Sequence, residues 1–103
     1  MPFVELIAVD RCRAGAGTFV EHDGLDLAVF ISADRDRVIV LDNTCPHAGG
    51  NLAAGTLDGH IVSCPWHHWK FDVRTGTCVD APRARVRRYN AELRRGVVFV
   101  DLT

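Results

Sequence analysis

Two short segments of this chain each combine a cysteine with a histidine at a spacing that suits metal binding. Residues 45–47 read Cys-Pro-His and residues 64–67 read Cys-Pro-Trp-His, with sixteen residues between the first histidine and the second cysteine. The proline after each cysteine fixes φ and stiffens the loop. Two such loops can converge on one site with two thiolates and two imidazoles. The candidate ligands are Cys45, His47, Cys64 and His67, and Gly49, Gly50 and Gly55 allow tight backbone paths beside them.

Two kinds of metal site use two cysteines and two histidines. A structural zinc ion binds them tetrahedrally, with pairs spaced C-x₂₋₄-C and H-x₃₋₅-H. A [2Fe–2S] cluster can instead hold both cysteines on one iron and both histidines on the other. Each segment here mixes cysteine with histidine, and the first has a single residue between them. Mixed segments favour the cluster, because each can give its cysteine to one iron and its histidine to the other. A zinc-stabilised interaction module remains the alternative from another functional class.

The residues around these ligands resemble the Rieske iron–sulfur signature, C-x-H-x₁₆-C-x₂-H. Residues 43–52 read N-T-C-P-H-A-G-G-N-L, and the similarity continues at 54–55, 71–72 and 75–76. The flanking strands and the closing hairpin are also similar, so the resemblance covers nearly the whole chain. It implies one Rieske-type [2Fe–2S] cluster per chain, with the cysteines on the inner iron and the histidines on the outer iron. His68 follows the second histidine directly, and the register favours His67 as the ligand.

The chain departs from some members of this family at four positions. Relatives of the respiratory cytochrome bc type tie the two loops with a disulfide, where this chain has Gly50 and Trp66. They also carry a serine and a tyrosine whose hydroxyls bond the cluster sulfurs, where this chain has Trp69 and Phe71. Fewer donors to a negative cluster imply a potential near the low end of the Rieske range of about −150 to +300 mV. This pattern is similar to the soluble ferredoxins of bacterial ring-hydroxylating oxygenases.

The resemblance therefore implies an electron carrier that is not itself an enzyme. It would pass single electrons from a flavin-dependent reductase to a terminal oxygenase. No mononuclear iron triad or substrate pocket can be found in the sequence. A second reading is a small Rieske subunit of a larger reductase, similar to the small subunit of assimilatory nitrite reductase, with the large subunit as its partner.

Length and composition fit one small cytoplasmic domain. The 103 residues are 48% apolar and 24% charged, which suits a single core and argues against disorder. No segment approaches the roughly 20 apolar residues that span a membrane. The first residues lack the basic region and long apolar stretch of a secretory signal. Cysteines in a reducing compartment are seldom in disulfides, so Cys12 and Cys78, outside the motif, are expected to be small buried apolar residues.

Charge is unevenly distributed along the chain. Residues 1–58 hold four arginines and nine acidic residues, a formal charge of −5, whereas residues 59–103 hold eight basic and four acidic residues, or +4. No nucleic-acid recognition motif accompanies the basic part, so we expect no nucleic-acid partner. We expect a solvated sheet face, with a docking face for an acidic protein as the alternative. The basic residues concerned are Arg83, Arg85, Arg87, Arg88, Arg94 and Arg95.

Short apolar runs broken by Gly, Asp, Asn and Pro predict an all-β fold. With the resemblance, this is a Rieske-type β-sandwich with a small cluster-binding subdomain of two loops. We expect a single domain over 1–103, with the subdomain at about 43–82 and a third loop at 80–82 screening the cluster. Residues 43–59 are expected to form a long irregular loop, with at most one helical turn at 51–54, and loops that long are usually functional. The expected strands span 3–9, 18–21, 25–32, 37–42, 60–63, 70–73, 85–93 and 97–102.

Overall fold

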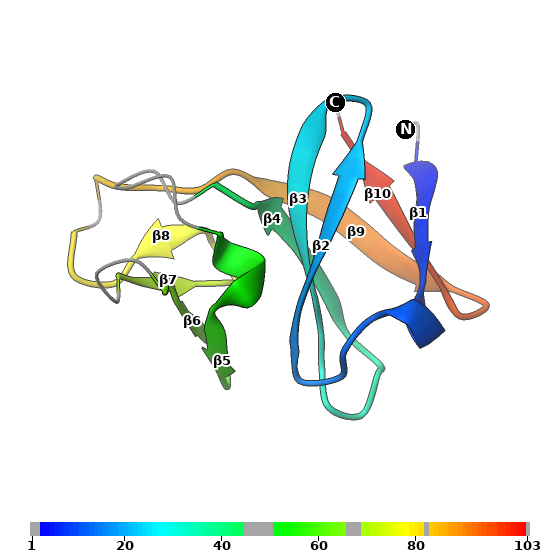
Figure 1. The fold of residues 1–103 in the computed structure, drawn as a ribbon, viewed down its shortest axis with the longest axis horizontal. Helices are drawn as coiled ribbons and strands as arrows, with labels where there is room; N and C mark the ends of the chain where they lie inside the picture. Colours follow the sequence, from blue (N-terminus) through cyan, green and yellow to red (C-terminus); the bar gives the residue numbers. More distant parts are fainter. Residues whose placement is uncertain (1–2, 45–50, 66–68, 82, 103) are drawn as a thin grey trace.

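A computed structural model describes residues 3–44, 51–65, 69–81 and 83–102, and they form two antiparallel β-sheets (Figure 1). The larger sheet has six strands in the order β1-β10-β9-β4-β3-β2, and the smaller has four in the order β5-β6-β7-β8. This confirms the predicted all-β class. The strands are β1 (Phe3–Ala8), β2 (Ala16–His22), β3 (Leu25–Ile31), β4 (Val38–Asp42), β5 (Thr56–Asp58), β6 (Ile61–Ser63), β7 (Lys70–Asp72), β8 (Thr77–Cys78), β9 (Arg88–Arg94) and β10 (Val97–Asp101), with 3₁₀ turns η1 (Val9–Arg11) and η2 (Leu52–Ala54).

Strand β3 is buried on both faces and divides the interior into two cores. Successive side chains of a strand point to opposite faces. Ala28 and Phe30 therefore join the core shared with the smaller sheet, whereas Leu27, Val29 and Ile31 join the core on the other side. All five are at most 3% exposed. A strand covered on both sides reads as a continuous apolar run, which is why this stretch of sequence is so uniformly apolar.

A tight hairpin joins β2 to β3 and fixes their register. Asp23 and Gly24 both have positive φ, 51° and 78°, as a two-residue turn of the type I′ family requires. The pairing runs without a slip from His22↔Leu25 to Ala16↔Ile31. The Asp-Gly pair thus sets a register in which the start of β2, at the end far from the turn, lies against the 3₁₀ turn η2.

The structure corrects several predicted boundaries. The stretch 43–59 is not wholly irregular, because it contains β5, whereas η2 agrees with the one helical turn expected at 51–54. Strand β8 was not predicted, since two residues are too few to show an alternating pattern. The end of the predicted first strand turns into η1, and β2 begins two residues before the predicted start. Residues 85–87 were predicted to belong to the closing hairpin, but β9 begins only at Arg88. Among the described residues, no helix is long and apolar enough to cross a membrane.

Candidate metal centre

Of the four predicted ligands, the structure describes Cys64. It directly follows β6 and is 0% exposed. Side chains two residues apart on a strand point to the same face. Cys64 lies two residues after the buried Val62 of β6, so both side chains point into the core. That face belongs to one core with Phe71 and Cys78. The other three ligands, Cys45, His47 and His67, lie outside the described residues, as do Gly49, Gly50, Trp66, His68 and Pro82.

The second ligand segment, residues 64–67, is held at both ends by the β6–β7 hairpin. Ser63 pairs with Lys70, and the backbone N–H of Cys64 donates to the carbonyl of Trp69 over 2.7 Å. The chain thus leaves the ladder at Cys64 and returns to it at Trp69. His67 lies in the sequence between these two hydrogen-bonded residues, so its segment has fixed ends.

The first ligand segment, residues 45–47, is anchored by Asn43, a buried residue that is 7% exposed. Its backbone N–H donates to the carbonyl of Asp26, and its own carbonyl accepts from Leu52, both over 2.9 Å. Its side-chain Oδ1 accepts from the N–H of Ala53, also over 2.9 Å. Thr44 and Asn51 then form an isolated antiparallel bridge. Cys45 and His47 therefore lie in the sequence between two paired residues, just as His67 lies between Cys64 and Trp69.

The bases of the two segments are in direct contact. Leu52 of η2 is fully buried in the same core as Cys64. Gly55 makes the close approach possible, because a Cβ on it would lie only 2.1 Å from the carbonyl oxygen of Ser63. Ser63 directly precedes Cys64, so this contact brings the end of the first segment beside the start of the second. The glycine noted in the sequence as permitting a tight path is thus required here.

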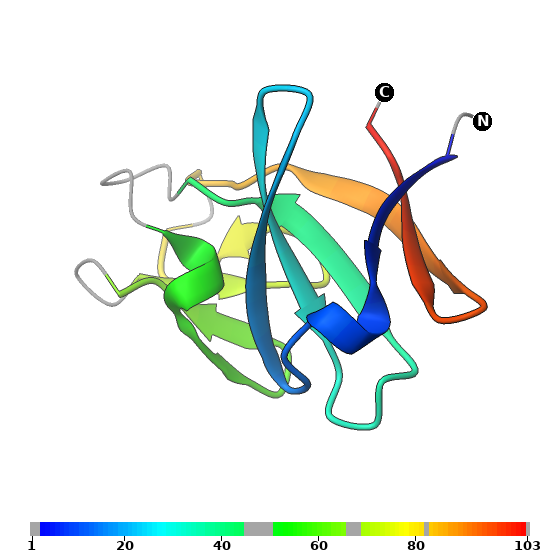
Figure 2. The ribbon, with the colours of Figure 1, turned by 45° about the vertical axis from the view of Figure 1, so that its right-hand side comes forward.

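The 3₁₀ turn η2 is also fixed to the large sheet, and it lies beside β2 in both views (Figures 1 and 2). A Cβ on Gly17 of β2 would lie 2.6 Å from the carbonyl oxygen of Ala53. The guanidinium of Arg13 donates to the carbonyls of Gly17 (2.6 Å) and Ala53 (3.3 Å). The functional importance of Asn43 and Arg13 as anchors was not foreseen. An asparagine directly before the Cys-containing segment was the one available signal.

The described residues fit a Rieske-type cluster. Its inner iron requires thiolates in a dry environment, and Cys64 is fully buried among apolar side chains. A mixed Cys/His donor set requires two chain segments presented together, and the two fixed segment bases are adjacent. Elsewhere among the described residues, no group of three or more His, Cys, Asp or Glu side chains gathers to hold a metal. A model of the Rieske [2Fe-2S] domain family matches residues 3–90.

The chain belongs to this family. As a Rieske domain it binds a Rieske-type [2Fe–2S] cluster.

Proteins similar to this Rieske domain over its whole length include ferredoxins. It is 28% identical to the ferredoxin component of the naphthalene 1,2-dioxygenase system of Pseudomonas putida, over 98% of this chain and 96% of the relative. The ferredoxin of carbazole 1,9a-dioxygenase from Nocardioides aromaticivorans IC177 is 27% identical, with a TM-score of 0.86 and 100% of both chains covered. A putative NADH-dependent nitrite reductase small subunit from Mycobacterium tuberculosis is 26% identical, with a TM-score of 0.85 over 96% of this chain and 93% of that one.

Other relatives are much longer. They are cholesterol 7-desaturases from Drosophila melanogaster and Hemicentrotus pulcherrimus, and oxygenase components of 3-ketosteroid-9-alpha-monooxygenases from Rhodococcus rhodochrous and Mycobacterium tuberculosis, 29–41% identical over the matched residues. The matches cover 64–95% of this chain, and the chain spans only 16–25% of the length of these relatives. The Rieske domain is thus found both as a ferredoxin and within larger oxygenases.

Phe71 and Trp69, the two residues expected to stand in place of hydroxyl-bearing side chains, carry no hydroxyl. Phe71 is 0% exposed, between Val62 and Cys78 on neighbouring strands. Trp69 is half-buried against the same core, as is Ala81 of the expected third loop.

The two cysteines outside the motif are buried as predicted. Cys12 is 4% exposed in the core on the far side of β3, and burial raises the pKa of its thiol. Cys78 is 2% exposed and pairs across strands with Phe71. Both therefore pack as small apolar residues.

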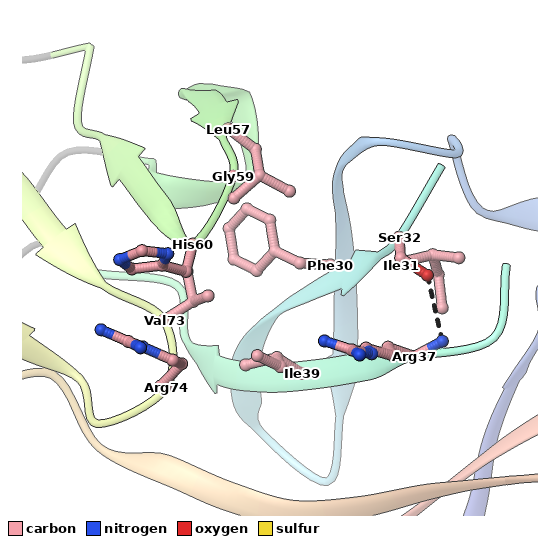
Figure 3. Close-up of a pocket in the computed structure, with 10 residues that line it drawn as sticks. All are labelled: Phe30, Ile31, Ser32, Arg37, Ile39, Leu57, Gly59, His60, Val73 and Arg74. Carbon is pink, nitrogen blue, oxygen red and sulfur yellow. Dashed lines mark hydrogen bonds between the residues drawn. The ribbon is translucent and has the colours of Figure 1, made fainter. Parts of the chain in front are cut away.

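A cleft of about 440 Å³ lies between residues of the two sheets (Figure 3). Its lining includes the apolar side chains of Phe30 and Val73, with Arg37, His60 and Arg74 beside them. Cys64, the ligand that the structure describes, does not line it.

Proposed function

We propose that this chain is a one-electron carrier that accepts electrons from a flavin-dependent reductase and delivers them to a terminal oxygenase. The observation that carries this proposal is the end-to-end similarity to the carbazole 1,9a-dioxygenase ferredoxin, in which each chain covers 100% of the other. The similarity to the ferredoxin of the naphthalene system is also almost end to end. In this reading the chain is a cytoplasmic electron-transfer component and catalyses no substrate conversion itself.

The proposed ligands are Cys45 and Cys64 for the inner iron, and His47 and His67 for the outer iron. Support comes from the mixed Cys/His segments, from the burial of Cys64 and from the adjoining segment bases. We also propose that 1–103 is one domain in which residues 43–82 form the cluster-binding part. The smaller sheet, β5 to β8, falls within this range.

The chain's own residues have two tasks in electron transfer. When bound, the cluster supplies a site that takes up and releases one electron. Apolar neighbours such as Leu52 and Phe71 keep water away from Cys64, and a dry thiolate resists exchange and oxidation. The hydrogen bonds of Asn43, and that between Cys64 and Trp69, hold the two segment bases in place. A rigid site changes little between redox states, which suits rapid electron exchange.

A second candidate function is a small Rieske subunit of a nitrite reductase. It is favoured by the similarity to the putative Mycobacterium tuberculosis small subunit, whose identity and TM-score nearly equal those of the carbazole ferredoxin. The fold therefore does not separate the two functions. Their partners do, because one requires a flavin reductase and an oxygenase and the other a large reductase subunit.

The test is an electron relay with partners encoded beside the gene. The purified chain would be mixed with NADH and the neighbouring flavin reductase, and reduction would be followed by the loss of visible absorption. We expect reduction within the turnover time of the reductase, and reoxidation when the neighbouring oxygenase and its substrate are added. If the chain instead co-purifies with a large sirohaem subunit and is not reduced by any flavin reductase, the second candidate replaces the first.

A further inference from the structure

An extended segment with exposed arginines joins the edge of the small sheet to the large sheet (Figure 1). Residues 83–88 alternate, so that Ala84 and Val86 point toward the core while Arg85 and Arg87 are exposed. The carbonyl of Ala84 accepts from the N–H of Cys78 over 2.9 Å, and Thr77 bridges to Arg85. The carbonyl of Arg87 then accepts from Asp42 of β4 over 2.9 Å. The backbone beneath the arginines is therefore fixed at both ends.

The β7–β8 turn packs against this arginine-bearing segment. Gly76 has φ of 81°, and a Cβ on it would lie 2.2 Å from the carbonyl oxygen of Val86. The N–H of Val86 donates to the carbonyl of Gly76 over 2.8 Å. The guanidinium of Arg74 donates twice to the carboxylate of Asp72, over 3.0 and 2.7 Å. The turn thus holds a positioned arginine against the arginine-bearing segment.

Together these residues line a groove that is strongly basic. Four guanidinium groups and no carboxylate line it among the described residues. Asp72 offsets the charge of Arg74 from outside the groove, and the side chain of Arg87 lies over the ring of Tyr89, 4.7 Å from its centroid. Arg85 and Arg88 are exposed to solvent. The lining of this arginine groove is Arg74, Thr75, Arg85, Val86, Arg87 and Arg88.

We propose that the arginine groove docks a patch of carboxylates on the surface of a redox-partner protein, an inference that rests on the proposed electron-carrier function. Arginine suits this task, because its planar guanidinium binds carboxylates through two parallel hydrogen bonds. A basic groove also steers an acidic partner during its approach. None of its described lining residues belongs to the two ligand segments.

The distribution of charge favours a protein over a nucleic acid as the occupant. Residues 1–58 carry a formal charge of −5, and the whole chain carries −1. A long polyanion extends beyond the groove, and the chain outside the four groove arginines carries a formal charge of −5, the whole chain's −1 less their +4. A compact acidic patch on a folded partner contacts the groove alone. The proposed occupant is therefore a protein surface.

The experiment measures binding of a fluorescent ten-residue polyglutamate peptide to the cluster-loaded chain by anisotropy, at low and at moderate salt. The groove variant is Arg85→Glu with Arg88→Glu. The matched control is Arg11→Glu with Arg95→Glu, which changes net charge equally at exposed positions in η1 and the β9–β10 turn. Both elements lie across the large sheet from β8 (Figure 1). A ten-nucleotide oligothymidylate serves as the rival anion.

We expect the peptide to bind the unchanged chain more tightly at low salt, because surface charges are screened over about 10 Å at 0.1 M. Because the two charge reversals turn attraction into repulsion, binding should weaken about tenfold or more in the groove variant. The control should weaken it less than about threefold. Equal losses in the two variants would show a nonspecific charge effect and overturn the proposal. Tighter binding of the oligonucleotide, lost only in the groove variant, would replace the protein partner with a nucleic acid.

A second readout separates failure of this proposal from failure of the electron-carrier function. The groove variant should keep its iron content and its reduction potential, and dithionite should reduce it as it reduces the unchanged chain. With the neighbouring reductase, its KM should rise while kcat stays the same. A groove variant with normal KM overturns the docking proposal alone. An unchanged chain that dithionite cannot reduce overturns the electron-carrier function, whatever the peptide shows.

Discussion

The phenol of Tyr89 on β9 donates a hydrogen bond to Oδ1 of Asp42 on β4 over 2.7 Å. Asp42 directly precedes Asn43, the residue that anchors the first ligand segment. Burial and the neighbouring Asp42 carboxylate raise the pKa of Tyr89 to about 12. This pair therefore links the closing hairpin of the large sheet to the base of the metal centre.

The first prediction is that Tyr89→Phe destabilises the chain without changing its shape. Tyr89 is 4% exposed, and hydrogen bonds to charged groups are worth about 1.5–3 kcal/mol. We expect the thermal midpoint to fall by about 5 °C or more. Asp42→Asn keeps an acceptor for the phenol, so its thermal midpoint should fall less than that of Tyr89→Phe. A Tyr89→Phe variant as stable as the unchanged chain would show that the bond contributes nothing.

The pH dependence provides the control for this prediction. A phenol with a raised folded-state pKa stabilises the fold fully below the unfolded value of about 10. That stability is lost as pH rises from about 10 toward the folded pKa of about 12. The difference in thermal midpoint between the unchanged chain and Tyr89→Phe should therefore shrink in that window. A difference that stays constant up to pH 12 would contradict the assignment.

The second prediction is that Gly55→Ala separates the bases of the two ligand segments. The added Cβ would lie 2.1 Å from the carbonyl oxygen of Ser63, a backbone atom that cannot rotate away. We expect iron content to fall well below that of the unchanged chain when both are reconstituted identically. Gly59→Asn is the matched control, because Gly59 faces open space at a φ of 62° that asparagine tolerates. Full iron content in the Gly55→Ala variant would mean that this contact is dispensable.

The third prediction concerns the reduction potential. Phe71 is fully buried in the core that contains Cys64, so a hydroxyl added there has few partners other than sulfur. A donor to sulfur favours the more negative, reduced state, and for one electron a tenfold change in equilibrium corresponds to about 59 mV. We expect Phe71→Tyr to raise the potential by some tens of millivolts and Phe71→Leu to cause no rise. Protein-film voltammetry checks this, and an unchanged potential in a folded, loaded Tyr variant would place Phe71 away from the sulfurs.

The fourth prediction separates ligand cysteines from packing cysteines. Cys45→Ser and Cys64→Ser should lose the cluster, and His47→Ala and His67→Ala should lose it or retain an unstable one. Cys12→Ala and Cys78→Ala should keep full iron content, because both side chains pack as apolar residues. Iron analysis after identical reconstitution checks all six variants. A requirement for Cys12 or Cys78 would overturn the ligand assignment.

The sequence was most informative where a local pattern determines structure. Strand β3 was predicted within one residue, because its apolar run and the preceding Asp-Gly turn are local signals. Strands β5 and β8 have only three and two residues, too few for a period to appear. Residues 85–87 show strand-like alternation, but the sequence does not reveal that Arg85 and Val86 bond to Thr77 and Gly76 of the small-sheet side instead of extending β9.

For the metal centre too, the sequence predicted the local features but not the long-range contacts. Its ligand types come from a local motif, and the burial of Cys64 agrees with it. The residues that hold the segments act over long distances in sequence. Arg13 contacts Ala53, 40 residues away, and Tyr89 reaches Asp42 across 47. Such contacts depend on sheet order and register, which single-sequence patterns do not specify.

The central claim is that this chain carries one Rieske-type [2Fe–2S] cluster, and metal analysis tests it most directly. The chain would be purified without air, and its iron, acid-labile sulfide and zinc would be measured on one sample against protein concentration. Two cysteines and two histidines on one cluster predict about two irons and two sulfides per chain, and a red-brown colour. Stoichiometric zinc with no acid-labile sulfide, in a colourless protein, would contradict the account.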